Sequence, residues 1–169
     1  MNFNFEYYKS FSKELENQWI KFENKIQITP FQSFIWLSHW QKTIGNNIDF
    51  IEPCIFVLKK LDEIIMIIPL GIKKNKGIKI IEWLGGHQTD YMCPLYDINN
   101  EFKISDIDYI WKKLIKLLPK YDVIHLTKQP NTIKNKINRF YKNFSYKFMM
   151  PALYIKLPKS WNEYIEING

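Results

Sequence analysis

The chain has 169 residues, of which 46% are hydrophobic and 17% aromatic, and this composition excludes a disordered chain and suits one globular domain. The formal net charge of +7 comes almost entirely from lysine, because Arg139 is the only arginine. Specific nucleic-acid recognition favours the bidentate guanidinium group, so we expect no specific nucleic-acid partner. The scattered lysines are expected to form a solvated surface.

Two cysteines, Cys54 and Cys93, permit one disulfide bond but do not require it. Cys54 lies in the apolar run CIFVL and is expected to be a small buried hydrophobic residue. The run IIMIIPLGI is about half as long as a transmembrane helix and contains Pro69. The N-terminal residues lack the pattern of a signal peptide. We therefore expect a cytoplasmic protein without a transmembrane segment.

The first part of the chain predicts a strand and two helices. After a strand at residues 2–8, Ser10 or Ser12 can cap a helix that runs to about Lys25. Its apolar residues recur at helical spacing and predict one buried face: Leu15, Trp19 and Phe22. A second short helix, which Gly45 can terminate, shows the same pattern at Phe34, Leu37, Trp40 and Ile44.

The middle of the chain changes to the pattern of strands. Three runs rich in β-branched residues, at 54–60, 63–74 and 77–86, predict three consecutive antiparallel strands. A short LDE turn separates the first two, and Gly77 can adopt the positive φ that the second turn requires. The second run is apolar on both faces near residues 64–68, so both faces of the sheet must be covered.

The remaining residues predict a helix over 105–121, a strand over 122–128, an amphipathic helix over 131–143, and one or two strands over 145–157. Capping boxes are expected at Ser105 with Asp108 and at Ser160 with Glu163. This order of elements predicts an α+β fold (an α/β sandwich) with a mixed, mainly antiparallel central sheet and helices on both faces. We expect residues 1–158 to form one domain and residues 159–169 to begin a linker or helix into a missing C-terminal domain.

Five segments occur in an order and spacing typical of one family: PFQSFIWLSHWQKTIG, PCIFVLKK, IIPLGIKK, WLGGHQTDYMCPLYD and SWNEYIE. The chain resembles the acetyltransferase branch that includes the cellulose-biosynthesis protein CelD, which is similar to the FemAB-like transferases and belongs to the GNAT superfamily. The strongest motifs are Phe31-Gln32-Ser33 with Trp36, Pro69-Leu70, and a spaced pattern at Gly85, Asp90, Tyr91, Pro94 and Leu95.

The resemblance implies a GNAT-like domain that is the N-terminal, acceptor-side half of an acyl-CoA-dependent N- or O-acyltransferase, acting in cell-envelope or polysaccharide biosynthesis. It implies a small-molecule or glycan-precursor acceptor, with acetyl-CoA or another acyl-CoA held by a missing C-terminal GNAT half. No cofactor is expected on this chain alone, because the segment after the third strand lacks spaced glycines and contains Pro94 where phosphate-binding backbone N–H groups would be needed. The alternative is a non-catalytic GNAT-like binding or interaction module.

The candidate site lies around Gly85-Gly86, where the chain can turn tightly at the end of a strand. Asp90 and Tyr91 are candidates for binding the acceptor, as are the motif residues Trp36 and Gln32. His87 is the candidate assisting base, since an unperturbed imidazole pKa of about 6.5 suits proton transfer.

Structural alternatives remain open for the same residues. Asp90 can cap local backbone, Tyr91 can fill the core, and His87 can be a solvent-facing loop residue. Trp36 and Trp40, at i and i+4, are first a packing signature and second a stacking platform. A catalytic set of Cys93 with His87 and Asp90 is disfavoured because nothing supplies an oxyanion hole, and a metal site is disfavoured because a further ligand is needed.

Overall fold

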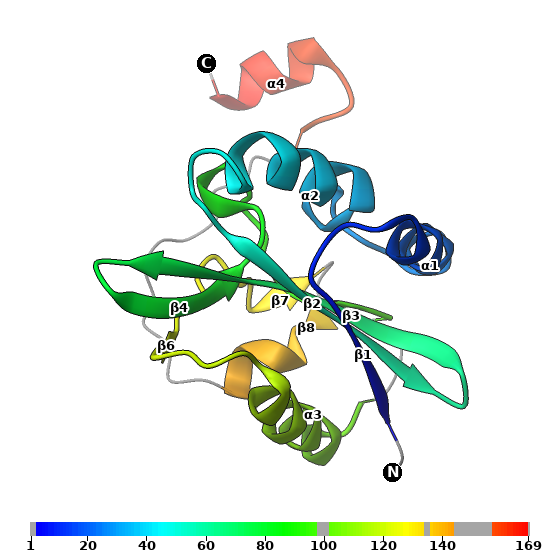
Figure 1. Ribbon diagram of the computed structural model, residues 1–169. Coiled ribbons are helices and arrows are strands. Elements are labelled where there is room, and N and C mark those ends of the chain that lie inside the picture. The colour runs from blue at the N-terminus through cyan, green and yellow to red at the C-terminus, as the bar shows by residue number, and fades with distance from the viewer. Residues whose placement is uncertain (1–2, 98–101, 134–135, 144–156, 169) are drawn as a thin grey trace.

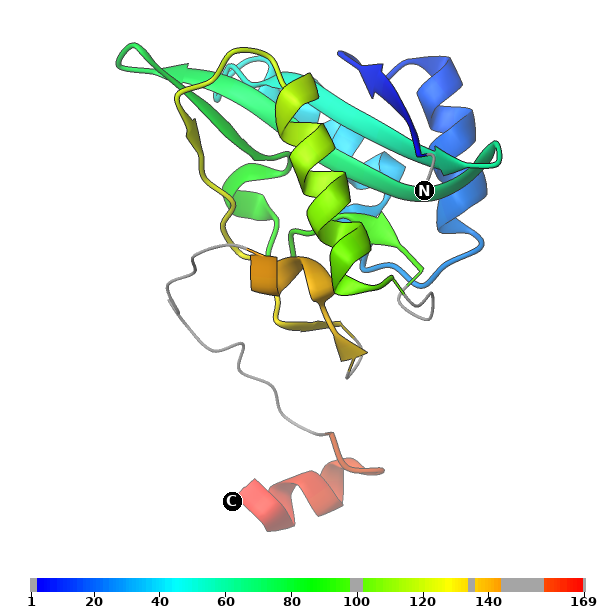
Figure 2. The same ribbon diagram turned by 90° about the horizontal axis from the view of Figure 1, so that it is seen from below.

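The computed structural model describes residues 3–97, 102–133, 136–143 and 157–168 (Figure 1). A six-stranded, mainly antiparallel sheet forms its centre. Two helices, α1 (Lys13–Glu23) and α2 (Phe34–Trp40), cover one face, and α3 (Ile104–Leu117) crosses the other, as Figure 2 shows from below. The predicted α+β fold is therefore confirmed.

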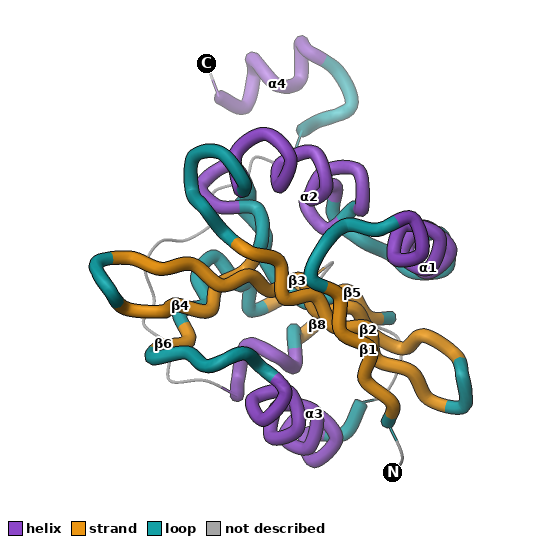
Figure 3. Tube along the Cα trace, viewed as in Figure 1, coloured by secondary structure: helices purple, strands orange, loops and turns teal. Residues whose placement is uncertain are grey.

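The strands follow the order β1-β2-β3-β4-β6 across the sheet, and Figure 3 shows them between the helical layers. Neighbouring strands are antiparallel except β4 and β6, which are parallel and are connected through α3. A further short strand, β5, pairs with β3. The strand bounds are Asn4–Tyr8 (β1), Glu52–Lys60 (β2), Glu63–Asn75 (β3), Ile78–Trp83 (β4), Leu95–Tyr96 (β5) and Val123–Ile124 (β6).

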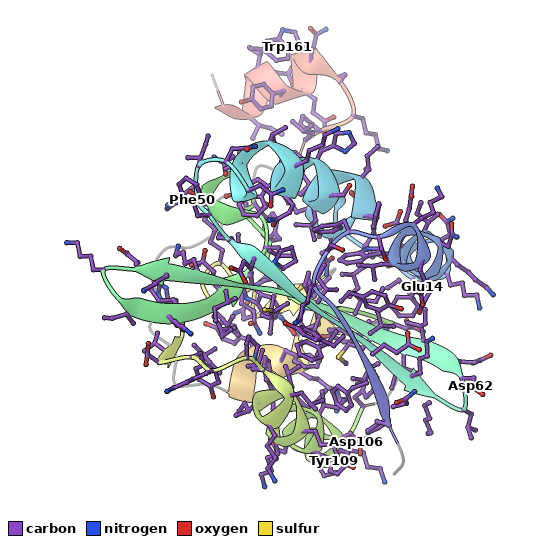
Figure 4. The ribbon with its side chains drawn as sticks, viewed as in Figure 1. Glu14, Phe50, Asp62, Asp106, Tyr109 and Trp161 are labelled. Atoms are coloured by element: carbon purple, nitrogen blue, oxygen red, sulfur yellow. The ribbon has the colours of Figure 1, made fainter. Side chains whose placement is uncertain are left out.

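The two predicted hairpin turns are confirmed. Leu61 and Asp62 connect β2 to β3 with positive φ angles of 49° and 62°, which is the twist that a two-residue hairpin requires. Asp62 lies at the tip of this hairpin (Figure 4). Gly77 connects β3 to β4 with a φ of 89°.

Both faces of the sheet bury apolar side chains, as the run at 64–68 predicted. Alternation along β2 sends Cys54, Phe56 and Leu58 to the α3 side and Ile55 and Val57 to the side of α1 and α2. The predicted helical faces take part in the second cluster through Leu15, Trp19, Phe22, Leu37 and Trp40.

Ser12, one of the two predicted caps, is the N-cap of α1: its hydroxyl accepts a hydrogen bond from Leu15 N at 3.2 Å. A short 3-10 turn, η1 (Pro30–Gln32), precedes α2. At its C-terminal end α2 continues as a π-helix, η2 (Gln41–Gly45), so Gly45 ends the helical segment as predicted.

The predicted N-cap of α3, Ser105, is wrong by two residues. Lys103 is the N-cap residue, and its backbone N–H donates to the Asp106 carboxylate at 2.9 Å, so Ser105 already lies inside the helix. Asp106 lies on α3 near Tyr109 in Figure 4. The buried Asp106 accepts a backbone N–H three residues before it, so the helix begins ahead of the Ser105 pattern, which had predicted a cap paired with Asp108.

The helix predicted over residues 131–143 is also wrong. This segment forms a small hairpin, β7 (Thr132–Ile133) with β8 (Lys136–Ile137), followed by a 3-10 helix, η4 (Arg139–Asn143). Asn138 is fully buried; its side chain donates to Pro130 O at 2.8 Å and accepts from Tyr96 OH at 3.0 Å. These tertiary hydrogen bonds override a weak helical pattern.

The strands predicted over 145–157 lie outside the described residues except for Leu157. The last helix, α4 (Trp161–Asn168), begins at the predicted cap, where Glu163 N donates to the Ser160 hydroxyl at 3.2 Å. In Figures 2 and 4 α4 stands apart from the sheet, and Trp161 is 71% exposed. None of the helices in the described part of the chain combines the length and apolar character that crossing a bilayer needs.

Candidate functional site

Residues 85–94 form the loop between β4 and β5, two strands that pair with successive parts of β3. Leu84 N donates to Pro69 O at 3.0 Å, and the chain returns to β3 where Leu95 pairs with Ile67. We call the intervening residues the 85–94 loop. It begins at the glycine pair, as predicted: Gly85 has a φ of +115°, and a Cβ atom there would lie 2.3 Å from Thr89 Oγ1. Only glycine therefore fits this turn without strain.

Gln32 from η1 fastens the C-terminal end of the 85–94 loop. Its Nε2 donates to Pro94 O at 3.0 Å and lies 3.2 Å from Cys93 Sγ, while its Oε1 accepts from Thr29 N at 3.0 Å. The side chain is 4% exposed. Both ends of the amide are thus occupied within the protein, and Gln32 acts on the loop rather than facing open space.

Two indoles from α2 fasten the N-terminal end of the loop. Trp36 Nε1 donates to Thr89 Oγ1 at 2.8 Å, and Trp40 Nε1 donates to Gln88 Oε1 at 3.1 Å. Thr89 is buried and its hydroxyl also donates to Gly85 O at 3.0 Å. The pair at i and i+4 therefore packs as expected, and it also joins α2 to a loop about fifty residues later in the chain.

Lys128 holds the outer side of the loop. Its Nζ donates to His87 O at 2.8 Å and to Asp90 Oδ1 at 3.3 Å, and its backbone carbonyl accepts from Met92 N at 3.1 Å. Lys128 adopts a φ of +53°, which is uncommon for a residue with a side chain. The Asp90 side chain is 69% exposed, so this ion pair is solvated and weak.

The predicted loop residues are placed at the surface. His87 and Asp90 are exposed, and Tyr91 is 40% exposed with its ring 6.1 Å from that of Phe31. The interpretation of Tyr91 as a core residue is therefore wrong, whereas His87 does face solvent. The partner of the Asp90 carboxylate is the Lys128 ammonium group rather than local backbone.

A groove of about 520 Å³ lies beside α2, where α2 meets the loop at Gln88. Its apolar lining consists of Pro30, Ile35, Trp36, Trp40 and Ile44, and its polar lining of Ser33, His39, Thr43 and Gln88. We call it the α2 groove. Of the predicted site residues, Trp36 lines it; Gln32, His87, Asp90 and Tyr91 do not.

Neither cysteine has the character of a nucleophile. Both are free and buried, so the predicted role of Cys54 in the core is confirmed. Burial raises the pKa of the Cys93 thiol to about 12, so it stays protonated at neutral pH. Within the described ranges, no cluster of three or more His, Cys, Asp or Glu side chains is arranged to hold a metal ion.

Sequence reasoning missed several residues of the site, namely Gln88, Thr89, Lys128, His39 and Thr43. The spacing of Trp36, His39, Trp40 and Thr43 on one helix carried a usable signal, because residues three and four apart share a helix face. The sequence around Lys128 carried no such signal, since its contacts are made with the distant 85–94 loop.

In comparisons with known proteins, no family model, curated protein or solved structure matches the chain. Function has therefore to be inferred from the geometry of the site, since one fold supports many activities.

Proposed function

We propose that this chain is the acceptor-side, N-terminal half of a GNAT-type acyl-CoA-dependent N- or O-acyltransferase with a small-molecule acceptor. The acceptor occupies the α2 groove. One observation carries the proposal: two of the three strongest motifs behind the resemblance, at 31–36 and 85–95, build one site through Gln32, Trp36 and the 85–94 loop. A ligand in the α2 groove would touch both segments, because Trp36 and Gln88 line it.

The topology of the sheet supports this proposal. Two helices precede an antiparallel meander of β2, β3 and β4, and α3 then returns the chain to β6, which is parallel to β4. This is the order of elements that the resemblance implies. The 85–94 loop follows the end of β4, a position where loops of sheet proteins commonly carry binding residues.

The acyl-CoA donor is assigned to a second GNAT half outside these residues. In a CoA site of the usual kind, backbone N–H groups at a helix N-terminus bind the pyrophosphate. At the start of α3, the Asp106 carboxylate already accepts from Lys103 N. A carboxylate in this first turn competes with a pyrophosphate for the same positive end of the helix dipole.

A thermal-shift titration with acetyl-CoA tests this division of labour. We expect acetyl-CoA to leave the melting temperature of the 169-residue chain unchanged and to raise that of the longer protein, since only ligands that bind the native state stabilise it. The longer protein should also transfer the acetyl group, and Trp36→Ala should raise KM for the acceptor more than it lowers kcat. Equal stabilisation of both chains, or a gene that stops at Gly169, would contradict the proposal.

The second candidate function is a non-catalytic binding module. It is favoured by the position of His87, the predicted assisting base, which does not line the α2 groove. A binding module needs the groove and no acyl donor. A longer protein that binds ligands in the groove but transfers no acyl group, with any of several acyl-CoA donors, would establish this alternative.

A further inference from the structure

The α2 groove has the volume of a small-molecule site, and aliphatic and aromatic side chains form most of its lining. Its volume of about 520 Å³ falls within the range of roughly 300–1,000 Å³ that is typical of ligand pockets. Although the chain carries a net charge of +7, no Lys, Arg, Asp or Glu is present among the described residues that line the groove. Since an apolar wall without a counter-charge disfavours a charged group, the part of the ligand that enters should be uncharged.

Both indoles line the groove, but Trp36 is half-buried whereas Trp40 is only 4% exposed, so Trp36 supplies most of the accessible aromatic surface. Their Nε1–H groups already donate to Thr89 and Gln88 of the 85–94 loop, at 2.8 Å and 3.1 Å. The polar end of each tryptophan is therefore used within the protein, and what remains for a ligand is aromatic surface. Ile35, which is 67% exposed, extends the apolar wall. Such a wall suits a ring with few polar groups better than a sugar with many hydroxyls.

His39 supplies a hydrogen-bond acceptor in the same groove. Its Nδ1 lies 2.9 Å from Ile35 O, and a carbonyl can only accept, so Nδ1 carries the hydrogen. In the neutral ring, Nε2 then holds a lone pair, and within the described part of the chain it has no hydrogen-bond partner. The imidazole can therefore accept from a hydroxyl group of a ligand.

The π-helix at Gln41–Gly45 is a second, independent feature of this wall. Asn46 N donates to Gln41 O at 2.8 Å, which is an i to i+5 bond, and the turn places Thr43 and Ile44 in the lining. The buried Gln41 side chain stabilises the widened turn by donating to Ile51 O at 2.6 Å. π-Helical turns are rare and occur frequently at functional sites.

We propose that the α2 groove binds an uncharged, largely apolar ring compound that bears a hydroxyl group, with the ring against Trp36 and Ile35 and the hydroxyl donating to His39 Nε2. This rests on the proposed function in one respect: if acyl transfer occurs, the hydroxyl oxygen would bond to the acyl carbon while its proton passes to Nε2, and the thioester C–S bond would break to release CoA as the thiolate. The binding itself requires no acyl donor.

An NMR titration of the 169-residue chain with phenol tests the inference. We expect phenol to shift the indole N–H resonances of Trp36 and Trp40, and to bind roughly three- to tenfold more tightly than anisole, whose methylated oxygen cannot donate. Phenyl phosphate and methyl glucoside should leave these resonances unshifted at the same concentration. Equal affinity for phenol and anisole, or tighter binding of the phosphate or the glucoside, would overturn the inference.

The matched variants are His39→Leu and His125→Leu. Both histidines are exposed, so neither change should unfold the chain, and His125 does not line the groove. His39→Leu should abolish the preference for phenol over anisole, whereas His125→Leu should retain it. A preference that survives His39→Leu would show that His39 is not the acceptor. Because no acyl donor is present, failure here leaves acyl transfer by the longer protein to be judged separately.

Discussion

The 85–94 loop requires a glycine at position 85, because any side chain there would be strained. Its φ of +115° is unfavourable for any other residue, and a Cβ would also collide with Thr89. Gly77 has a φ of +89° but open space around it, so a substitution there measures the cost of backbone strain without a steric collision. We expect Gly77→Ala to lower the free energy of unfolding by about 1–2 kcal/mol. Gly85→Ala should lower it by roughly 2–4 kcal/mol, because overpacking adds to the backbone strain.

Urea denaturation of the two variants measures this difference, and tryptophan fluorescence adds a local readout. Thr89 accepts a hydrogen bond from the indole N–H of Trp36. Because the new Cβ in Gly85→Ala would displace Thr89, the tryptophan emission of the native state should change in this variant and not in Gly77→Ala. Equal losses of stability in the two variants would mean that the contact with Thr89 contributes nothing.

The edge strand β1 is fixed to its neighbours through Glu6. Burial raises the pKa of the Glu6 carboxyl, but hydrogen bonds from Lys59, Gln18 and Tyr8 outweigh it and the net pKa is below the ordinary value. Because the folded-state pKa is depressed, the stabilisation is present above the unfolded-state pKa of about 4.3 and is lost as pH falls through the folded-state pKa. Its size should lie within about 1 kcal/mol, as for other partly exposed ion pairs.

The measurement compares the free energy of unfolding of wild type and Glu6→Gln between pH 7 and pH 3. We expect the two chains to differ at neutral pH and to converge in acid. Lys59→Met removes the donor at 2.6 Å and should flatten the pH dependence of wild type in the same way. A difference that stays constant across the range would show that the pKa of Glu6 is the same in the folded and unfolded chains.

The alkylation rates of the two cysteines, which lie in different parts of the fold, can distinguish local opening of the loop from unfolding of the whole domain. Cys54 is 1% exposed within β2, and Cys93 is 2% exposed within the 85–94 loop. Since the thiolate is the reactive form and both thiols are buried, we expect slow alkylation by iodoacetamide at pH 8 and fast alkylation in urea. Cys93 should react before Cys54, because the loop is held by side-chain hydrogen bonds rather than by a strand ladder.

Mass spectrometry of partly labelled chains gives the two rates separately. Lys128→Met removes the contacts to His87 O and Asp90, so it should accelerate labelling of Cys93 and leave Cys54 unchanged. Identical rates at both cysteines in both chains would indicate that the 85–94 loop opens only when the whole domain unfolds.

The sequence by itself determined the elements whose signals are local. The apolar spacing of α1 and α2, the strand runs on both sides of Leu61-Asp62, and the turn at Gly85 all follow from side-chain periodicity or from a required backbone conformation. These patterns act over a few residues, so they can be read without knowing what packs against them. The same is true of the layered α+β arrangement, because a run that is apolar on both faces must be covered twice.

Only the tertiary structure decided how the distant segments meet. The paired strands β7 and β8 stand where a helix was predicted, because buried Asn138 bonds to Pro130 and Tyr96. The candidate site likewise depends on Trp36 reaching Thr89 and on Lys128 reaching the loop. A hydrogen bond between segments tens of residues apart leaves no periodic trace in either one. Its energy depends on burial and geometry, which exist only once the sheet and its covering helices have formed.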